Sequence, residues 1–344
     1  MRKLLNYLSP FAPDQSGAVS ALFECGGLTV ICDAGGCTGN ICGFDEPRWF
    51  TAHSAIFSAA LRDMDAILGR DKALVEKISD AATTLKPAFV AIIGTPVPAV
   101  IGTDMNALKR MTEKATGLPC FAFATKGTAY YEQGVSDAQL AIVKHYTANC
   151  QCEIIPGTVG LLGATPLDLS RCDAAYECTA LRQRGYNTIL SFGMGCGLEG
   201  YRRAAQCEKN FVVAPAGLAA ARALQRVFGI PYAPFFPALP EFAAEEVTGK
   251  KILVVHQQIA ANALREKLEQ AGASAVSVAS WFTLDDEFAR EGDRAITGEE
   301  DFATRVADGN YDIIAGDHAF RHALPDYHGA WIDFPHFAVS GSLA

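Results

Sequence analysis

The stretch LTVICDAGGCTGNICG, residues 28–43, carries the strongest local signal for the fold. Residues 28–32 form an apolar, β-branched run of the length expected for a buried strand. The turn at 33–36 follows directly, and its two glycines permit backbone conformations that other residues resist. Cys37 and Cys42 come next, in a Cys-x4-Cys spacing. The stretch therefore predicts a parallel-sheet strand that ends in a glycine turn carrying two thiols.

Apolar runs alternate with amphipathic stretches along the rest of the chain, which is the βαβ pattern of parallel sheets. Further strands are predicted at 88–93, 119–124, 188–192, 211–213, 251–255, 275–279 and 311–315. Helices are predicted at 52–68, 71–85, 104–115, 136–148, 174–184 and 218–228, with another that ends at 271.

We therefore predict an α/β fold of three doubly wound, Rossmann-like parallel-sheet domains. The predicted domains are 1–150, which contains the cysteine-bearing turn, 151–245 and 246–344. Two stretches rich in turn-forming residues mark the boundaries, at 151–169 and 231–240.

The composition excludes several classes of function. The 344 residues carry a net charge of −9 and no stripe of Lys or Arg. Nucleic-acid binding is therefore not expected, because phosphate binding needs clustered cations. Residues 1–10 lack the features of a signal peptide, and no apolar stretch is long enough to span a membrane. We expect a cytoplasmic protein whose eleven cysteines are buried thiols, reactive thiols or metal ligands rather than disulfides.

Several segments, in the same order, resemble the nitrogenase component 1 type oxidoreductases. That family includes the dark-operative protochlorophyllide and chlorophyllide reductases and the nickel-sirohydrochlorin reductive cyclase. The strand and turn at 28–37 resemble the segment that delivers a cluster-binding cysteine in those proteins. The other similar segments are 63–72, 98–104, 213–217, 228–231, 311–316 and 333–337. The resemblance covers nearly the whole chain and implies a nitrogenase component 1-like fold.

The chain departs from the family pattern at three cysteine positions. The early loop at 9–13 has no cysteine, and the position after the second strand falls at about Pro96. No cysteine stands near Ala214 and Pro215, where the nitrogenase cofactor would be anchored. The resemblance therefore implies a nitrogenase-like oxidoreductase that lacks the complex nitrogenase clusters and does not reduce dinitrogen.

The resemblance also implies a metal site at the glycine turn. Cys37 and Cys42 are the expected iron ligands, because soft thiolates suit iron–sulfur clusters. Gly36 and Gly39 would let such a cofactor approach the backbone closely. Family dimers place this turn near the subunit interface, so two turns would supply four ligands to one [4Fe–4S] cluster. The second subunit would be an identical copy or a paralogue. Cys32, at the end of the strand, is either a third nearby metal ligand or a core residue.

Candidate catalytic residues follow the turn in the segment 44–49. Asp45, Glu46 and Arg48 either orient and protonate a substrate or form an ordinary helix start with acidic residues and a proline. Lys126, as a cofactor contact, and His336, as a catalytic group, stand at loop positions where α/β sites collect functional residues. A solvent-exposed lysine and a partly buried histidine are the alternatives.

Two further motifs leave alternatives open. Cys150 and Cys152 form a Cys-x-Cys that is either a metal-binding pair or a pair of alternating residues at the start of a strand. The segment 195–200 matches G-x-G-x-x-G, but no acidic residue follows at the spacing that dinucleotide binding favours. A glycine-rich connection between strand and helix is the simpler interpretation.

No P-loop motif occurs, so the chain is not expected to hydrolyse ATP. The resemblance implies a separate P-loop iron protein that hydrolyses ATP and passes electrons to this subunit. The substrate would be a tetrapyrrole or a small unsaturated or sulfur-containing molecule. The alternatives are a non-catalytic scaffold that assembles or carries a metallocluster, and a nicotinamide-linked oxidoreductase that uses 195–200.

Overall fold

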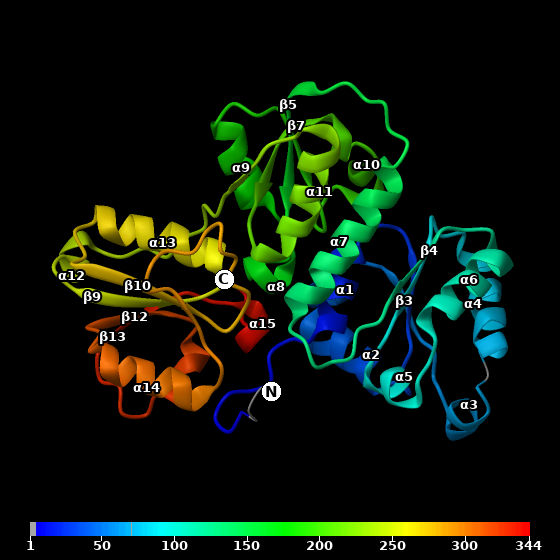
Figure 1. Cartoon of the computed structure of the whole chain (residues 1–344), viewed down its shortest axis with the longest axis horizontal. Helices are drawn as coiled ribbons and strands as arrows, with labels where there is room; N and C mark the ends of the chain where they lie inside the picture. The colour runs from blue at the N-terminus through cyan, green and yellow to red at the C-terminus, as the bar shows by residue number, and fades with distance from the viewer. Residues whose placement is uncertain (1–4, 70) are drawn as a thin grey trace.

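The computed structural model of the chain describes residues 5–69 and 71–344. Three sheets follow one another, with strands within 28–123, 155–234 and 251–333 (Figure 1). Neighbouring strands in all three sheets are parallel. The predicted α/β fold with several parallel-sheet domains is confirmed.

The first sheet has the strand order β2-β1-β3-β4. Its central strands, β1 (Leu28–Ile31) and β3 (Val90–Ile93), are buried along their whole length. They are flanked by β2 (Ala55–Ser58) and β4 (Cys120–Phe123). The chain order reverses between β1 and β3, and in such sheets ligand sites lie at the carboxyl ends of the strands around this reversal.

Helices cover both faces of the first sheet. The helices α4 (Asp71–Leu85) and α6 (Met105–Thr116) pack on one face in one apolar cluster. The helices α1 (Asp14–Leu22) and α7 (Tyr131–Thr147) contribute to the larger cluster on the other face.

The other two sheets repeat this architecture. The second has the order β6-β5-β7-β8 and the third the order β11-β10-β9-β12-β13. The second sheet consists of β5 (Ile155–Leu162), β6 (Thr188–Ser191), β7 (Cys207–Val212) and β8 (Tyr232–Pro234). The third consists of β9 (Lys251–Val255), β10 (Ala275–Ser280), β11 (Arg294–Ala295), β12 (Ile313–Gly316) and β13 (Ala330–Asp333).

The remaining helices connect or cover the strands. In the first domain they are α2 (Gly36–Asn40), a π-helical turn η1 (Ile41–Asp45), η2 (Pro47–Phe50), α3 (Asp63–Leu68) and α5 (Pro96–Ile101). The later ones are α8 (Pro166–Leu169), α9 (Ala175–Gln183), α10 (Gly197–Arg202), η3 (Ala204–Gln206), η4 (Pro215–Gly217), α11 (Leu218–Phe228), α12 (Ala244–Val247), α13 (Gln258–Gln270), α14 (Glu299–Gly309), η5 (His318–Ala323) and α15 (Phe337–Ser340). In the described part of the chain, no helix is both long and apolar enough to cross a lipid bilayer.

Helix α7 joins the first domain to the second (Figure 1). It packs against α1 on one side and against α10 and α11 on the other. The crossing of α1 and α7 is so close that a Cβ added at Gly134 would overlap the carbonyl of Asp14. A Cβ at Gly17 would overlap the carbonyl of Tyr131 in the same way. Glycine at these two positions therefore sets the distance between the helices.

The structure differs from the predicted elements in several places, and α1, α14 and β13 were not predicted at all. The range 52–68, predicted as one helix, contains the edge strand β2 and the short helix α3. The predicted boundary at 151–169 contains β5, which is central in the second sheet. The predicted linker at 231–240 contains the short edge strand β8.

Candidate functional site

The glycine turn is attached to the first sheet by Asp33, a buried residue two positions after the end of β1. Its carboxylate accepts hydrogen bonds from the Thr38 N–H at 2.7 Å and the Thr38 hydroxyl at 3.0 Å. It also accepts one from the Ser58 hydroxyl on β2 at 2.6 Å. Gly35 has a φ of 115°, which a residue with a side chain resists. These contacts fix α2 at the carboxyl end of β1.

The two predicted metal ligands lie in consecutive helical turns. Cys37 is in α2, and Cys42 is in the π-helical turn η1, a rare type of turn that is frequent at functional sites. Cys37 is partly exposed, whereas Cys42 is buried, and both pack against the cluster that contains α1 and α7. Burial raises the pKa of both thiols, and the charge of Asp33 adds to the effect; the pKa of Cys42 is raised to about 11.

The surroundings of these thiols fit part of an iron–sulfur site. A Cβ added at Gly36, Gly39 or Gly43 would meet no atom within 4 Å, so the outer surface of the turn is open. Among the described residues of a single chain, no three His, Cys, Asp or Glu side chains converge as a metal-binding group. Because the raised pKa values disfavour the free thiolates, a bound cation would be needed to hold them in that form. The role of Cys37 and Cys42 as metal ligands stays a prediction.

Cys32 lies on the opposite face of the sheet. Successive residues of a strand point to opposite faces, and Cys32 belongs to the cluster with Leu74 and Ile78 of α4. Burial raises the pKa of its thiol to about 12. Cys32 is therefore a core residue, and it is separated from Cys37 and Cys42 by the sheet. Of the two interpretations left open for Cys32, its position favours the core residue.

A cavity of about 710 Å³ lies beside the π-helical turn. Four segments distant in sequence form its wall, and they include the loop at 9–13 and the end of the chain after His336. Among the described residues that line it, Asp45 is the only one with an ionisable side chain. The lining residues are Ser9, Pro10, Phe11, Ala12, Pro13, Asn40, Gly43, Phe44, Asp45, Pro47, Phe50, Gly127, Phe337, Ala338, Val339, Ser340 and Gly341.

Asp45 is half-buried in this wall. Its Oδ2 accepts hydrogen bonds from the Ser16 hydroxyl at 2.6 Å and from the Asn40 amide at 3.1 Å. Burial nevertheless raises the pKa of the Asp45 carboxyl above its usual value, and the two hydrogen bonds only partly oppose this effect. The position suits a group that holds a proton beside a bound molecule. The catalytic role of Asp45 stays a prediction.

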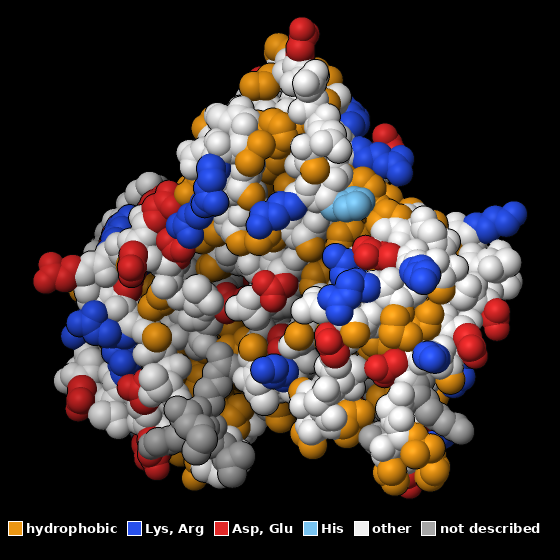
Figure 2. Space-filling model, turned by 45° about the vertical axis from the view of Figure 1, so that its right-hand side comes forward, with side chains coloured by type: hydrophobic (Ala, Val, Ile, Leu, Met, Phe, Trp, Pro, Cys, Tyr) orange, Lys and Arg blue, Asp and Glu red, His pale blue; other side chains and the backbone are white. Residues whose placement is uncertain are grey.

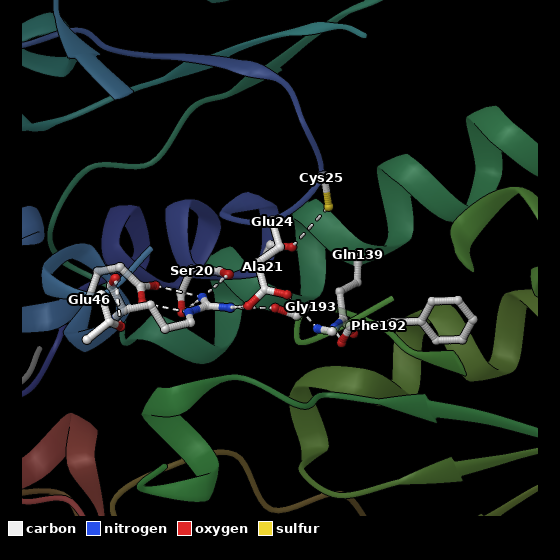
Figure 3. Close-up of polar contacts among 11 residues, drawn as sticks. Ser20, Ala21, Glu24, Cys25, Glu46, Gln139, Phe192 and Gly193 are labelled. Atoms are coloured by element: carbon white, nitrogen blue, oxygen red, sulfur yellow. Dashed lines mark hydrogen bonds and ion pairs between the residues drawn. The ribbon is translucent and has the colours of Figure 1, made fainter. Parts of the chain in front are cut away.

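Arg48 occupies a structural position instead of a substrate-facing one. Its hydrogen-bond partners Ser20, Glu24, Glu46 and Gly193 are labelled in Figure 3. Nε and Nη2 donate to the two carboxylate oxygens of Glu46 at 2.7 Å each, and Nη2 also donates to the Ser20 carbonyl at 2.7 Å. Nη1 donates to Glu24 at 3.0 Å and to the Gly193 carbonyl at 2.7 Å.

These contacts occupy every N–H of Arg48, which is 2% exposed. The guanidinium of Arg48 also lies over the face of the Phe23 ring, with its central carbon 4.7 Å from the ring centroid. This contact completes the enclosure of the guanidinium. Arg48 therefore ties the first domain to the second and has no donor left for a substrate. These contacts favour the structural interpretation of Arg48 over the predicted catalytic one.

Lys126 is exposed, and its side chain is not among the groups that line the cavity. Its backbone N–H donates to Asp14 at 2.9 Å, and the N–H of Gly127 donates to the same carboxylate at 2.8 Å. Asp14 thereby holds the loop that brings Gly127 to the cavity. The sequence offered no local signal for this role, because Asp14 lies more than a hundred residues from its partners. The cofactor-binding role of Lys126 stays a prediction.

His336 is buried at the junction of the three domains. Its Nε2 lies 3.2 Å from the hydroxyl of Tyr131 in α7, and its ring stacks on Phe282 with centroids 4.7 Å apart. The ring of His256 lies 4.6 Å away. Burial lowers the pKa of His336 well below its ordinary value, and the neighbouring His256 lowers it further.

The position of His336 relative to the cavity is indirect. The imidazole does not line the cavity, but residues 337–341, which follow it, do. Its backbone N–H donates to the buried Asp317 at 2.8 Å, and Asp317 also accepts from the Ser340 hydroxyl at 2.7 Å. His336 is thus placed to hold α15 against the cavity. This position differs from the predicted contact with a substrate.

The glycine-rich segment 195–200 does not form an open anion site. The N–H of Gly195 donates to the carboxylate of Glu24 at 2.5 Å, so an acidic side chain already occupies the place of an anion. A Cβ at Gly200 would overlap the side chain of Cys196. Gly200 therefore serves close packing, and Gly195 and Gly197 serve the turn through their positive φ values of 94° and 53°. These roles disfavour the nicotinamide alternative.

Three parallel-sheet domains and a cysteine-bearing glycine turn at the end of β1 define the class of protein. The chain belongs to the nitrogenase component 1 type oxidoreductase family, whose sequence model matches residues 17–240. This match confirms the family that the sequence resembles.

Individual relatives add detail. The nitrogenase iron-molybdenum cofactor biosynthesis protein NifE of Klebsiella pneumoniae is 35% identical over 72 residues, which are 21% of this chain and 16% of that protein. The matched region thus spans less than a fifth of NifE.

Two solved structures share the fold. They are nitrogenase Cp1 at pH 5 and at pH 6.5, each with a TM-score of 0.73 and with 14% and 12% identity. The match with the pH 5 structure includes 99% of this chain and 86% of the nitrogenase chain. The match with the pH 6.5 structure includes 97% and 87%, respectively.

Proposed function

We propose that the chain is the iron–sulfur subunit of a nitrogenase-like reductase. In this proposal it accepts low-potential electrons from a separate, ATP-hydrolysing P-loop iron protein and passes them to a molecule bound in the cavity beside Asp45. The observation that carries the proposal is the placement of Cys37 and Cys42 in the turn whose neighbours Asn40 and Gly43 line that cavity.

The cofactor would be held between two protomers. Cys37 and Cys42 of each protomer would be its ligands, and when bound it would supply one-electron transfer at low potential. The surface around the turn supports such a contact, because Phe44 and Phe50 are 74% and 73% exposed. Large apolar side chains at a surface favour burial against a partner.

Further apolar side chains extend this surface along the same edge of the first domain. Met64, Ile67 and Leu68 of α3 are exposed, as is Val100 of α5. In Figure 1, α2, α5 and α3 follow one another along this edge, and Figure 2 shows hydrophobic side chains gathered at the tip formed by α3. A second copy or a paralogous subunit is the occupant that the proposal assigns to this edge.

The residues of the chain would position the substrate and supply a proton. The buried Phe11 and Phe337 of the cavity would exclude water, and Asp45 would hold a proton at its carboxyl group. The lining lacks Lys and Arg among the described residues, so it favours a small, uncharged unsaturated or sulfur-containing molecule. A tetrapyrrole with several carboxylates would need cationic groups from the second subunit.

Iron and sulfide analysis of anaerobically purified protein tests the cofactor assignment. We expect about four iron per dimer and a loss of most of the iron in the variants Cys37→Ser and Cys42→Ser. Cys32→Ser and Cys178→Ser are the matched controls, because Cys32 lies across the sheet and Cys178 lies in the second domain, and both should keep their iron. A colourless, iron-free anaerobic preparation would contradict the proposal, as would equal losses in all four variants.

A scaffold for metallocluster assembly or transfer is the second candidate function. The similarity to NifE, which is named as a cofactor biosynthesis protein, favours it. The two functions differ in what happens to the metal. Transfer of the bound iron to an apo-acceptor protein, without reduction of any added substrate, would support the scaffold. Retention of the iron during electron transfer from an iron protein would support the reductase.

A further inference from the structure

Cys150 and Cys152 are joined by a disulfide. The bond lies in the connection between α7 and β5, where the chain passes from the first domain to the second. The sequence left two interpretations of this pair open, a metal-binding pair and alternating residues at the start of a strand. Neither applies, because the two sulfurs are bonded to each other and the strand begins only at Ile155. The other nine cysteines are free thiols, so the bond is not part of a disulfide framework.

This disulfide is a poor structural brace. The stabilisation that a disulfide gives grows with the length of the loop that it closes. Here the loop contains one residue, Gln151, and the bond links no two elements that the chain does not already connect. Its contribution to the free energy of unfolding is therefore small, and a chemical role is the better explanation.

The bond is also accessible. Cys152 is exposed and Cys150 partly exposed, and the connection runs over the end of the second domain in Figure 1. Ile154 and Ile155 follow directly and are 49% and 41% exposed, which gives a partner an apolar surface beside the sulfurs. Exposed disulfides are the ones that exchange readily with thiols.

We propose that Cys150 and Cys152 form a thiol–disulfide exchange site whose substrate is a dithiol, either a small molecule or a protein. The site is independent of the iron–sulfur assignment. A thiolate of the dithiol attacks Sγ of Cys152, the more exposed sulfur, and the sulfur of Cys150 leaves as a thiolate. The second thiol of the reductant then attacks the mixed disulfide and releases Cys152. The reductant leaves as a disulfide, and its two protons end on Cys150 and Cys152, so two electrons pass to the protein.

The first test follows the redox state of each cysteine in the full-length, folded protein. Samples equilibrated with oxidised or reduced dithiothreitol are alkylated with N-ethylmaleimide and analysed by peptide mass spectrometry. We expect Cys150 and Cys152 to be protected in oxidised buffer and fully alkylated in reduced buffer. Cys172 and Cys178, which are partly exposed free thiols, should be alkylated in both and serve as internal controls. Alkylation of all four cysteines in oxidised buffer overturns the site, as does a bond that opens only after denaturation.

The second test identifies the attacked sulfur. Of the two cysteines in this pair, the variant Cys150→Ser keeps only Cys152, and the variant Cys152→Ser keeps only Cys150. We expect oxidised glutathione to form a mixed disulfide several-fold faster in Cys150→Ser, because Cys152 is the more exposed. Equal rates or the reverse order would overturn the assignment of Cys152. Neither variant should change the iron content, so this outcome is distinguishable from a failure of the iron–sulfur proposal.

Discussion

The hydroxyl of Tyr131 donates a 2.6 Å hydrogen bond to the carboxyl group of Asp168, and both side chains are fully enclosed. The bond connects α7 to α8, and the Tyr131 hydroxyl also lies 3.2 Å from His336 of the third domain. Burial raises the pKa of Asp168 well above its usual value. The junction of the three domains is therefore a buried polar cluster in which the neutral forms of the side chains are favoured.

Replacing Tyr131 with Phe should destabilise this junction. The variant keeps the ring but removes the closer of two donors to the buried carboxyl group of Asp168; the other is the Thr165 hydroxyl, at 3.4 Å. We expect the free energy of unfolding to fall by about 1–3 kcal/mol, as measured by urea denaturation. The control is Tyr176→Phe, since Tyr176 is 51% exposed and should change stability by less than about 0.5 kcal/mol. Equal effects of the two substitutions would show that the hydrogen bond contributes nothing.

The buried His256 should make the protein sensitive to mild acid. Burial lowers the pKa of His256 from 6.5 to about 4. As the pH falls, the unfolded chain binds the proton first, so the stability is complete above pH 6.5 and is lost between 6.5 and about 4. The loss reaches about 3 kcal/mol from this residue, and His336 acts in the same direction.

The variant His256→Gln isolates this contribution. Urea denaturation at pH 7 and pH 5 should show a smaller difference in stability for the variant than for the wild type. His318→Gln, at a side chain that is 53% exposed, should keep the wild-type difference. An unchanged pH dependence in His256→Gln would refute the argument.

Arg48→Lys should weaken the attachment of the second domain to the first. Lysine has three donors in place of five and cannot bind the two oxygens of Glu46 side by side. Because Glu46 is 1% exposed, an incompletely paired carboxylate would be left in the interior. We expect a loss of about 3–5 kcal/mol in chemical denaturation. Arg202→Lys, in the exposed pair with Glu199, is the matched control and should lose less than about 1 kcal/mol.

Gly134→Ala tests the close crossing of α1 and α7. The added methyl group would overlap the carbonyl of Asp14, and the helices would have to separate. We expect a destabilisation of about 3 kcal/mol. Gly39→Ala adds the same methyl group in α2, where nothing lies within 4 Å, and should be neutral or slightly stabilising. A similar effect of the two substitutions would contradict the packing argument.

The parts of the fold that the sequence predicted are those with strong local patterns. The apolar run at 28–32 and the glycines at 35 and 36 predicted β1 and its turn. The central strand β5 was missed because Pro156, Gly157 and Gly160 are typical of a turn. Gly160 is required there because a Cβ would overlap the side chain of Asn210 on the next strand. Such a reason is visible only when both strands are in place.

The candidate site shows the same limit. Cys37, Cys42 and Asp45 belong to one continuous segment, so their nearness to one another could be predicted from their spacing, whereas their roles stay predictions. The contacts of Arg48 could not be predicted, because the Gly193 carbonyl that it binds lies 145 residues further along the chain. Long-range partners of this kind leave no trace in local sequence.

The part of the cavity wall that residues 337–341 form has a consequence for the order in which the cavity is assembled. These residues leave the ribosome after all three sheets have been translated, and they reach their place only when the third domain docks on α8. The pocket is therefore incomplete on a nascent chain. A molecule held there is enclosed by wall segments from the first and the third domain together.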